Sequence, residues 1–188
     1  MEKTFIVETS ARHVHITAEA QDILFGKGYA LTPKKSLSQP GQFACEEKVT
    51  VIGPKGELKM SILGPVRPYN QVEVSKSDAR TLGLNPDVRE SGDLSGTPGC
   101  KMVGPKGEVE IKDGVIVALR HVHFTPKDAE EFGVKDKEII KVCCGGEGRK
   151  LIFDDVLARV SETAGLAMHI DTDESNAAYG ATTGYVVR

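Results

Sequence analysis

The tetrapeptide Arg-His-Val-His occurs twice in the chain, at residues 12–15 and 120–123, and holds four of its five histidines. Imidazole groups are common ligands of zinc and other transition metals. On a β-strand, histidines at positions i and i+2 point to the same face about 6.5 Å apart, whereas on a helix they diverge. One His-x-His motif is weak evidence for a metal site, because two half-exposed strand histidines give the same pattern. Its recurrence with arginine and valine intact predicts two metal sites.

The residues after each pair favour a strand that runs into a short helix. Thr17 and Thr125 are placed as helix N-caps, and both expected helices end near a glycine, Gly26 and Gly133, as left-handed caps commonly do. The same arrangement recurs at residues 71–83. The chain therefore contains a repeated strand, cap and helix unit.

The alignment of these copies also suggests further ligands. When Ser75 is aligned with the two threonine caps, Glu73 falls level with His15 and His123. Glu73 is thus one candidate for completing a site, and His169, the fifth histidine, is the other. Three protein ligands leave a coordination position open, as in catalytic zinc sites. Imidazole with carboxylate suits zinc, and less specifically Co, Ni, Mn or Fe. The expected ligands are His13, His15, Glu73, His121, His123 and His169.

Arg67 lies between two prolines, six residues before Glu73. An arginine held by a rigid turn close to a metal ligand can bind a phosphate or carboxylate with two hydrogen bonds. Arg12 and Arg120 are expected to face away from the histidines that follow them and to serve as structural partners. The sequence shows no phosphate-binding glycine loop and no nucleophile elbow.

The elements that position these residues are predicted to be mostly β. The segment Gly-Pro-Lys-Gly-Glu occurs at residues 53–57 and 104–108, and each copy has Pro and Gly where a hairpin turn needs them. Residues 154–163 show helical spacing. We expect two small β-barrel domains built from a duplicated unit and capped by short α-helices, residues 1–92 and 93–188, with elements exchanged between the two allowed.

Composition narrows the range of functions. The chain has 188 residues and a net charge of −3, with basic residues spread along it, which predicts neither a nucleic-acid partner nor a membrane partner. It also contains no apolar run long enough for a membrane span, so we expect an intracellular protein with reduced cysteines. The sequence allows a homo-oligomer without fixing its size.

Four separated motifs resemble one known family, the phosphate propanoyltransferases or PduL-type phosphotransacylases. They are the two Arg-His-Val-His segments, the stretch at residues 64–79, the Ser-Gly-Asp-x-x-Gly-Thr-Pro-Gly run at residues 91–99, and the tail at residues 169–177. They cover nearly the whole chain in order. This resemblance implies two helix-capped β-barrels and reversible exchange of an acyl group between coenzyme A and phosphate.

The resemblance also implies a dinuclear zinc site at the junction of the domains. One ion would be held by His13, His15 and Glu73, and the second ion by His121, His123 and His169. Arg67 would bind phosphate, and acetyl-CoA or propanoyl-CoA would be the partner substrate. Asn176 is a candidate contact for coenzyme A, whereas the pair Arg149 and Lys150 has the character of an ordinary solvated surface.

Two other hypotheses for the function compete with an acyltransferase. One is a metal-dependent hydrolase of a thioester or related substrate, although the common His-x-His hydrolases use a larger (β/α)₈ barrel. The other is a non-catalytic, metal-stabilised microcompartment module, in which both metal sites would be closed. Encapsulated members of the family carry an N-terminal extension, whereas here the first expected strand begins at Phe5, so we expect either a cytoplasmic member or a microcompartment member whose extension lies outside this sequence. Neither acetyl nor propanoyl is favoured by the sequence.

Overall fold

The computed structural model describes residues 3–145 and 148–188, which pack into two compact units. The barrel unit consists of Met1–Ser10, Ser38–Pro40 and Leu119–Arg188, and the sheet unit consists of Ala11–Leu37 and Gly41–Ala118. In the part of the chain that is described, no helix is long and apolar enough to cross a membrane. The expected mostly β fold with short helices is confirmed.

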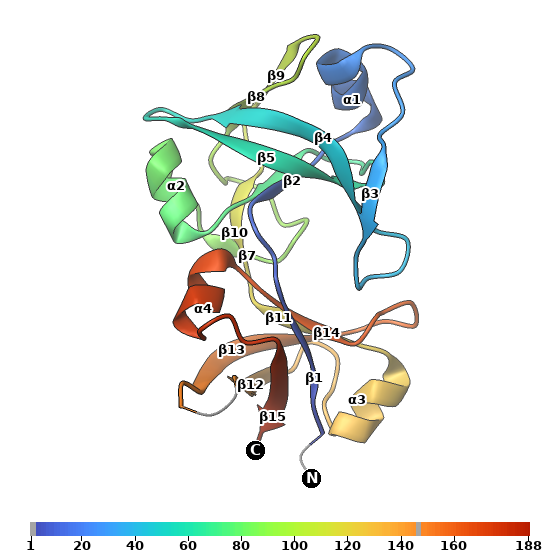
Figure 1. Cartoon of the computed structure of the whole chain (residues 1–188), viewed down its shortest axis with the longest axis vertical. Helices are drawn as coiled ribbons and strands as arrows, with labels where there is room; N and C mark the ends of the chain where they lie inside the picture. The colour runs from blue at the N-terminus through green and yellow to red at the C-terminus, as the bar shows by residue number, and fades with distance from the viewer. Residues whose placement is uncertain (1–2, 146–147) are drawn as a thin grey trace. The chain divides into compact units, whose positions relative to one another are not determined.

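The barrel unit is a closed barrel with the strand order β1-β14-β11-β13-β12-β15 (Figure 1). Its elements are β1 (Phe5–Thr9), β11 (His121–Phe124), α3 (Pro126–Phe132), β12 (Ile139–Cys144), β13 (Leu151–Val160), β14 (Ala167–Ile170), α4 (Thr172–Ala177) and β15 (Thr183–Val187). The interior is apolar because alternate strand residues point inward, among them Val122, Phe124 and Met168, each with no exposed surface. The residues between them face outward.

The sheet unit is a nine-stranded sheet with the order β7-β10-β6-β2-β5-β4-β8-β9, and its remaining strand β3 pairs with β4 (Figure 1). Its elements are β2 (His13–His15), α1 (Ala18–Phe25), β3 (Pro33–Ser36), β4 (Phe43–Ile52), β5 (Glu57–Gly64), β6 (Gln71–Glu73), α2 (Lys76–Leu82), β7 (Val88–Arg89), β8 (Cys100–Val103), β9 (Glu108–Ile111) and β10 (Val115–Ala118). Unlike the barrel unit, this sheet does not close.

The units are not continuous stretches of chain. β1 belongs to the barrel unit, whereas β8 to β10 belong to the sheet unit. The expected domains, residues 1–92 and 93–188, allowed for such exchange of elements. Compact packing does not by itself define independently folding domains, so that boundary stays a prediction.

Each short helix begins at a polar cap. The side chains of Thr17, Ser75, Thr125 and Asp171 accept a hydrogen bond from the third residue of α1, α2, α3 and α4, respectively. This satisfies a backbone N–H that would otherwise lack a partner at the helix start. The two threonine caps were predicted. Gly133 has the expected left-handed conformation, but Gly26 does not, since its φ of 105° is combined with a ψ of 148°.

The two Gly-Pro-Lys-Gly turns form the expected hairpins and also finish two helices. The backbone N–H of Lys55 donates to the carbonyl of Leu82 at the end of α2, and Lys106 donates to Leu24 near the end of α1, both at 3.0 Å. A Cβ at Gly53 would lie 2.3 Å from the Leu82 carbonyl oxygen, so only glycine allows this approach. The hairpins thus fix the helices that follow β2 and β6.

The prediction of a helix at residues 154–163 is wrong, because β13 continues to Val160. β12 and β13 shift register between Ile140 and Val142, and Asp155 has a positive φ of 52°. Such a bulge places Val156 and Leu157 both in buried positions, which breaks the alternation of a strand and imitates helical spacing.

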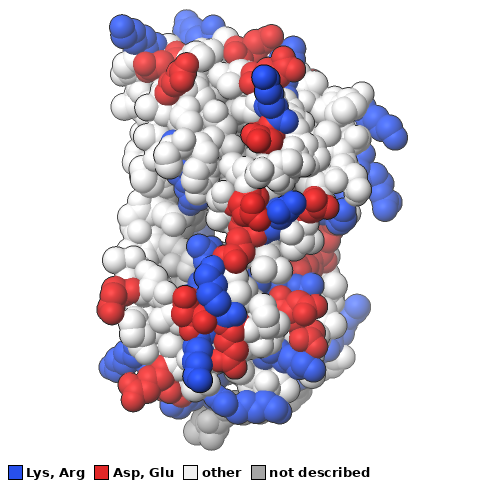
Figure 2. Space-filling view, turned by 180° about the vertical axis from the view of Figure 1, so that it is seen from behind, with Lys and Arg blue, Asp and Glu red and all other residues white. Residues whose placement is uncertain are grey.

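Charges of opposite sign are intermingled on the molecular face shown in Figure 2. The described surface also carries ion pairs, such as Lys101 with Glu108 at 3.4 Å and Lys141 with Asp154 at 3.1 Å. Pairs of this kind neutralise the charge locally on exposed surface and contribute little to stability.

Candidate metal centres

The candidate centre of the sheet unit lies on the antiparallel pair β2 and β6. The register places His13 directly opposite Glu73 and His15 opposite Gln71. His13 Nε2 is 3.4 Å from Glu73 Oε2, and His15 Nε2 is 3.9 Å from Glu73 Oε1. One donor atom from each of these three residues lies within 4.8 Å of the others. The structure therefore brings together the three ligands predicted for the first ion.

The alternation of the strands directs these side chains to one face. Val14 and Val72 are completely buried in the apolar core, so the residues on either side of each valine point away from it. His13 Nδ1 lies 2.9 Å from the carbonyl of Ala11, and His15 Nδ1 lies 3.2 Å from that of Leu63. When Nδ1–H donates to a carbonyl, Nε2 keeps its lone pair for a metal.

The two histidines of this centre titrate differently. Burial and the neighbouring charges of His13 and Arg67 lower the pKa of His15 to about 3. Burial also disfavours the charged form of His13, but the Glu73 carboxylate outweighs it and leaves the pKa of His13 above its ordinary value. At neutral pH, His15 is thus a neutral ligand that has no proton to lose.

Gln71 and Ser91 hold the Glu73 carboxylate in place. Gln71 Nε2 donates to Glu73 Oε1 at 2.6 Å, and Ser91 Oγ donates to the same oxygen at 3.2 Å. Gln71 also donates to Ser91 Oγ and accepts a hydrogen bond from the Gly92 N–H. The sequence reasoning missed both residues, although the repeat gave a signal for Gln71, which aligns with His13 and His121.

Arg67 lies at the same centre. Its guanidinium donates to Ser91 Oγ and to Gln42 Oε1, both at 3.4 Å, and its charge contributes to the lowered pKa of His15. Its backbone N–H donates to the carbonyl of Ile16, just after β2. Hydrogen bonds this long are weak and to neutral groups, so a bound anion would replace them at little cost.

The candidate centre of the barrel unit is built in the same way on β11 and β14. Here His121 is paired directly opposite His169, as His13 is with Glu73. His121 Nε2 lies 3.1 Å from His123 Nε2, and the ring of His169 lies 5.2 Å from that of His121 and 5.1 Å from that of His123. The structure thus brings together the three ligands predicted for the second ion.

Hydrogen bonding and burial prepare these histidines as they do in the sheet unit. His121 Nδ1 lies 2.8 Å from the carbonyl of Leu119, which leaves Nε2 available as a ligand. Burial, together with the nearby charges of His121 and His169, lowers the pKa of His123 to about 3. His123 is therefore also neutral at neutral pH.

The arginine of each repeat anchors the helix that follows the third ligand. Arg12 pairs with Asp78 of α2 at 2.8 Å, and Arg120 pairs with Glu174 of α4 at 3.0 Å. Asp78 and Glu174 each lie five positions after the third ligand and three after the cap. The expectation that both arginines are structural partners agrees with these contacts.

The donor sets fit a divalent transition metal. Two imidazoles with a carboxylate, or three imidazoles, are ligand sets of mononuclear zinc sites with an open position. The four cysteines are free and buried, and burial raises the pKa of the Cys144 thiol to about 12, so a thiolate ligand is not provided.

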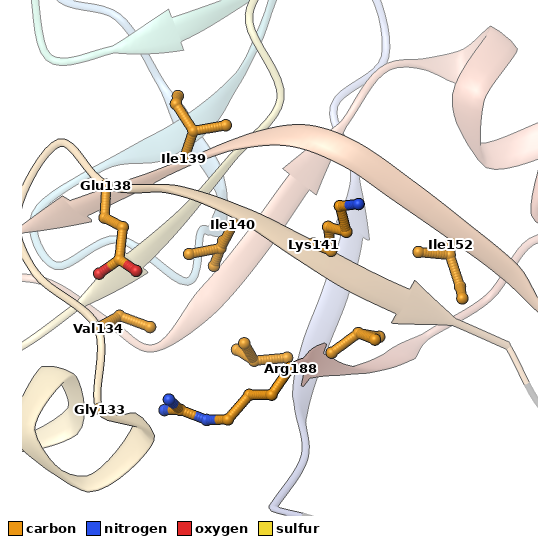
Figure 3. Close-up of a pocket in the computed structure, with 10 residues that line it drawn as sticks. Gly133, Val134, Glu138, Ile139, Ile140, Lys141, Ile152 and Arg188 are labelled. Carbon is orange, nitrogen blue, oxygen red and sulfur yellow. The ribbon is translucent and has the colours of Figure 1, made fainter.

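The candidate coenzyme A contact and one surface pocket of the barrel unit do not include the ligand histidines. Asn176 is exposed on α4, near the exposed ring of Tyr179, over which Arg149 stacks at 5.3 Å. A separate pocket of about 710 Å³ runs along β12 (Figure 3). It is lined by Gly133, Val134, Glu138, Ile139, Ile140, Lys141, Ile152, Val186, Val187 and Arg188, and contains none of the predicted site residues.

Comparison with known proteins identifies the family of the chain. The sequence model of the phosphate propanoyltransferase family matches residues 6–181. A phosphate propanoyltransferase of Thermotoga maritima is 55% identical over 94% of this chain and 85% of its own length. Proteins of the same name from Clostridioides difficile and Sebaldella termitidis are each 54% identical, over 91% and 98% of this chain and 82% and 88% of theirs. The chain belongs to the phosphate propanoyltransferase family of acyltransferases.

Proposed function

We propose that the protein is a zinc-dependent phosphotransacylase that reversibly transfers a short acyl group, acetyl or propanoyl, between coenzyme A and inorganic phosphate. The observation that supports this most strongly is the sheet-unit centre, where an arginine lies beside a two-histidine, one-carboxylate cluster. Family membership supports the reaction class, and the two ligand clusters support two zinc ions per chain.

The reaction itself explains why such residues are needed. An oxygen of phosphate forms a bond to the thioester carbonyl carbon, and the carbon–sulfur bond breaks to release the coenzyme A thiolate. His13, His15 and Glu73 would hold a divalent ion, which would supply Lewis acidity for the carbonyl and positive charge for the leaving thiolate. The protein must also hold an anionic nucleophile against an anionic substrate, which requires fixed positive charge and gains from precise placement.

We assign the binding of phosphate to Arg67. Its planar guanidinium can offer two parallel N–H donors to phosphate oxygens, and Ser91 and Gln42 hold it at the centre until phosphate arrives. Gln71 and Ser91 keep the Glu73 carboxylate directed toward His13 and His15. The ligand residues therefore need little rearrangement to bind an ion.

We assign a contact with coenzyme A to Asn176. This residue is exposed on α4, the helix that follows the strand of His169, and its amide can both donate and accept hydrogen bonds. An Asn176→Ala variant is expected to raise the KM for acetyl-CoA or propanoyl-CoA without changing the KM for phosphate. An equal rise in both constants would contradict this assignment.

The release of free thiol from acetyl-CoA and from propanoyl-CoA tests the proposed function. Zinc-loaded protein should release thiol only when phosphate is present, and zinc-depleted protein should regain this activity on reloading. Release without phosphate would identify a hydrolase, and no release from either thioester would favour a non-catalytic metal-stabilised module. The ratio of the two initial rates identifies the preferred acyl group.

A further inference from the structure

Glu8 and Ser38 contact the ligand histidine His169 in the barrel unit. The Oε2 atom of Glu8 lies 3.2 Å from His169 Nε2 and accepts a hydrogen bond of 2.6 Å from Ser38 Oγ. Ser38 Oγ itself lies 3.2 Å from the same nitrogen. Neither residue belongs to a predicted site, and both come from parts of the chain far from residue 169.

The strand order explains how Glu8 reaches this position. β1 runs parallel to β14, and the register places Glu8 beside His169. In the sheet unit, β10 runs parallel to β6 in the same way, and the residue beside Glu73 is Ile116, which is completely buried. The two units therefore share the strand arrangement, but the register partner of the third ligand on the parallel strand is acidic in the barrel unit and apolar in the sheet unit.

A second contact fixes the segment that carries Ser38. The side chain of Gln39 is buried and makes two hydrogen bonds with the backbone of Gly165: Nε2 donates to its carbonyl at 2.9 Å, and Oε1 accepts from its N–H at 3.2 Å. A Cβ at Gly165 would lie 2.3 Å from the Ser38 carbonyl oxygen. The backbone of Ser38 is thus held against the loop that leads into β14.

The other ligand histidines indicate what this contact does. His13, His15 and His121 each direct Nδ1 to a backbone carbonyl and thereby leave Nε2 for a metal. In His169 it is Nε2 that faces an oxygen acceptor. A carboxylate accepts the N–H of an imidazole, which fixes the tautomer and makes the other nitrogen a stronger ligand.

Building on the proposed metal sites, we propose that Glu8 and Ser38 are positioning residues of the barrel-unit centre. His169 donates Nε2–H to Glu8, Ser38 holds the Glu8 carboxylate in place, and His169 binds the divalent cation through Nδ1. The barrel-unit centre thus has a carboxylate–histidine–metal arrangement, whereas in the sheet unit the carboxylate of Glu73 is itself a ligand.

Zinc affinity in a protein with only the barrel-unit centre tests this inference. Glu8→Ala, Glu8→Gln and Ser38→Ala are introduced into the full chain carrying His13→Ala and His15→Ala, and zinc binding is measured by competition with a chromophoric chelator. Loss of a partner of this kind typically weakens metal binding by about 10-fold to 100-fold, which we expect for Glu8→Ala. Glu8→Gln should lose less, because the amide oxygen still accepts the hydrogen bond. Glu130→Gln and Ser36→Ala, at exposed positions, are the matched controls.

The nitrogen that binds the cation provides a second readout that needs no variant. In protein loaded with ¹¹³Cd and labelled with ¹⁵N in its histidines, the metal should couple to Nδ1 of His169 and to Nε2 of His121. Coupling to Nε2 of His169, or a Glu8→Ala affinity equal to that of the controls, would overturn the inference. If the unmodified protein bound no zinc, the proposed function would fail as well, whereas unaltered zinc affinity of the Glu8→Ala protein, in a chain whose unmodified form binds zinc, would refute only the role of Glu8.

Discussion

The two candidate metal centres have the same backbone plan and different polar surroundings. In each unit, a His-Val-His strand pairs antiparallel with the strand that carries the third ligand, in the same register. In each, the third ligand stands two residues before a helix cap, and the arginine before the histidine pair binds the acidic residue of that helix. The two units thus share the features that set the positions of the ligands.

The differences lie at two neighbouring positions. The residue two places before the third ligand is Gln71 in the sheet unit, where it binds the Glu73 carboxylate, and the buried Ala167 in the barrel unit. The residue on the adjacent parallel strand is Ile116 in the sheet unit and Glu8 in the barrel unit. Each centre therefore has one carboxylate, but one centre places it among the ligands and the other places it behind a ligand. The repeated backbone geometry therefore sets where an ion would bind, while the neighbouring side chains set the polar environment of its ligands.

The largest expected effect comes from removing one ligand of a single centre. His15→Ala should lose the ion of the sheet unit, and His123→Ala should lose that of the barrel unit, because each donor set lies within one unit. Each variant should keep about one zinc by elemental analysis and lose roughly 1,000-fold or more in turnover, as the loss of a Lewis acid implies. Loss of both ions from either variant would contradict the independence of the centres.

The next effect separates phosphate binding from metal binding. Arg67→Ala should raise the KM for phosphate and lower kcat/KM by roughly 100-fold to 1,000-fold, because it removes a charged donor from the reacting phosphate. Zinc content should be unchanged, and Arg80→Ala, an exposed arginine of α2, serves as the control. Loss of zinc from Arg67→Ala would assign the residue to the integrity of the centre and not to phosphate.

Proton competition should produce a smaller change in the sheet unit. The raised pKa of His13 means that a proton competes with zinc as the pH falls through that pKa, while His15 stays neutral down to about pH 3. Zinc affinity should therefore fall by about tenfold per pH unit below the pKa of His13 and level off above it. Titration of a His121→Ala, His123→Ala protein between about pH 5 and pH 9 measures this slope. A slope of two protons per ion would show that His15 also competes.

The smallest effect concerns the arginine–carboxylate ion pair that each unit contains. Arg12→Ala and Arg120→Ala should each destabilise their own unit by about 1–2 kcal/mol, because each leaves a largely buried carboxylate without its charged partner. For Asp78 the loss is aggravated by Oδ2, which is buried without a hydrogen-bond partner. Urea unfolding followed by far-UV circular dichroism measures the free energy of unfolding of each variant. A loss of unfolding free energy in only one of the two variants would show that the arginines are not equivalent.

The ligands could be predicted from the sequence because their positions depend on local order. A strand, a cap and a helix repeat at fixed spacing, so His15, Glu73 and His123 occupy equivalent places wherever the copies fold. The hairpins at the two Gly-Pro-Lys-Gly segments were predictable for the same reason, since the turn and its flanking strands are neighbours in the chain.

The surroundings of the centres could not be predicted, because they depend on contacts between distant segments. Glu8 reaches His169 only because β1 lies parallel to β14, and Ser38 reaches it only because Gln39 binds Gly165. Whether a sheet closes also depends on long-range pairing: β1 pairs with both β14 and β15 and so completes the barrel. The bulge near Asp155 also depends on pairing between two strands, β12 and β13, and its effect on burial made the segment resemble a helix in the sequence.

Anomalous diffraction at the zinc absorption edge, from crystals of the zinc-loaded protein, most directly tests the central claim that each unit builds one metal centre on the same backbone plan. The predicted result is two peaks per chain, one bonded to His13, His15 and Glu73 and the other to His121, His123 and His169, with metal–ligand distances of about 2.0–2.2 Å. A single peak, or peaks away from these six side chains, would contradict it.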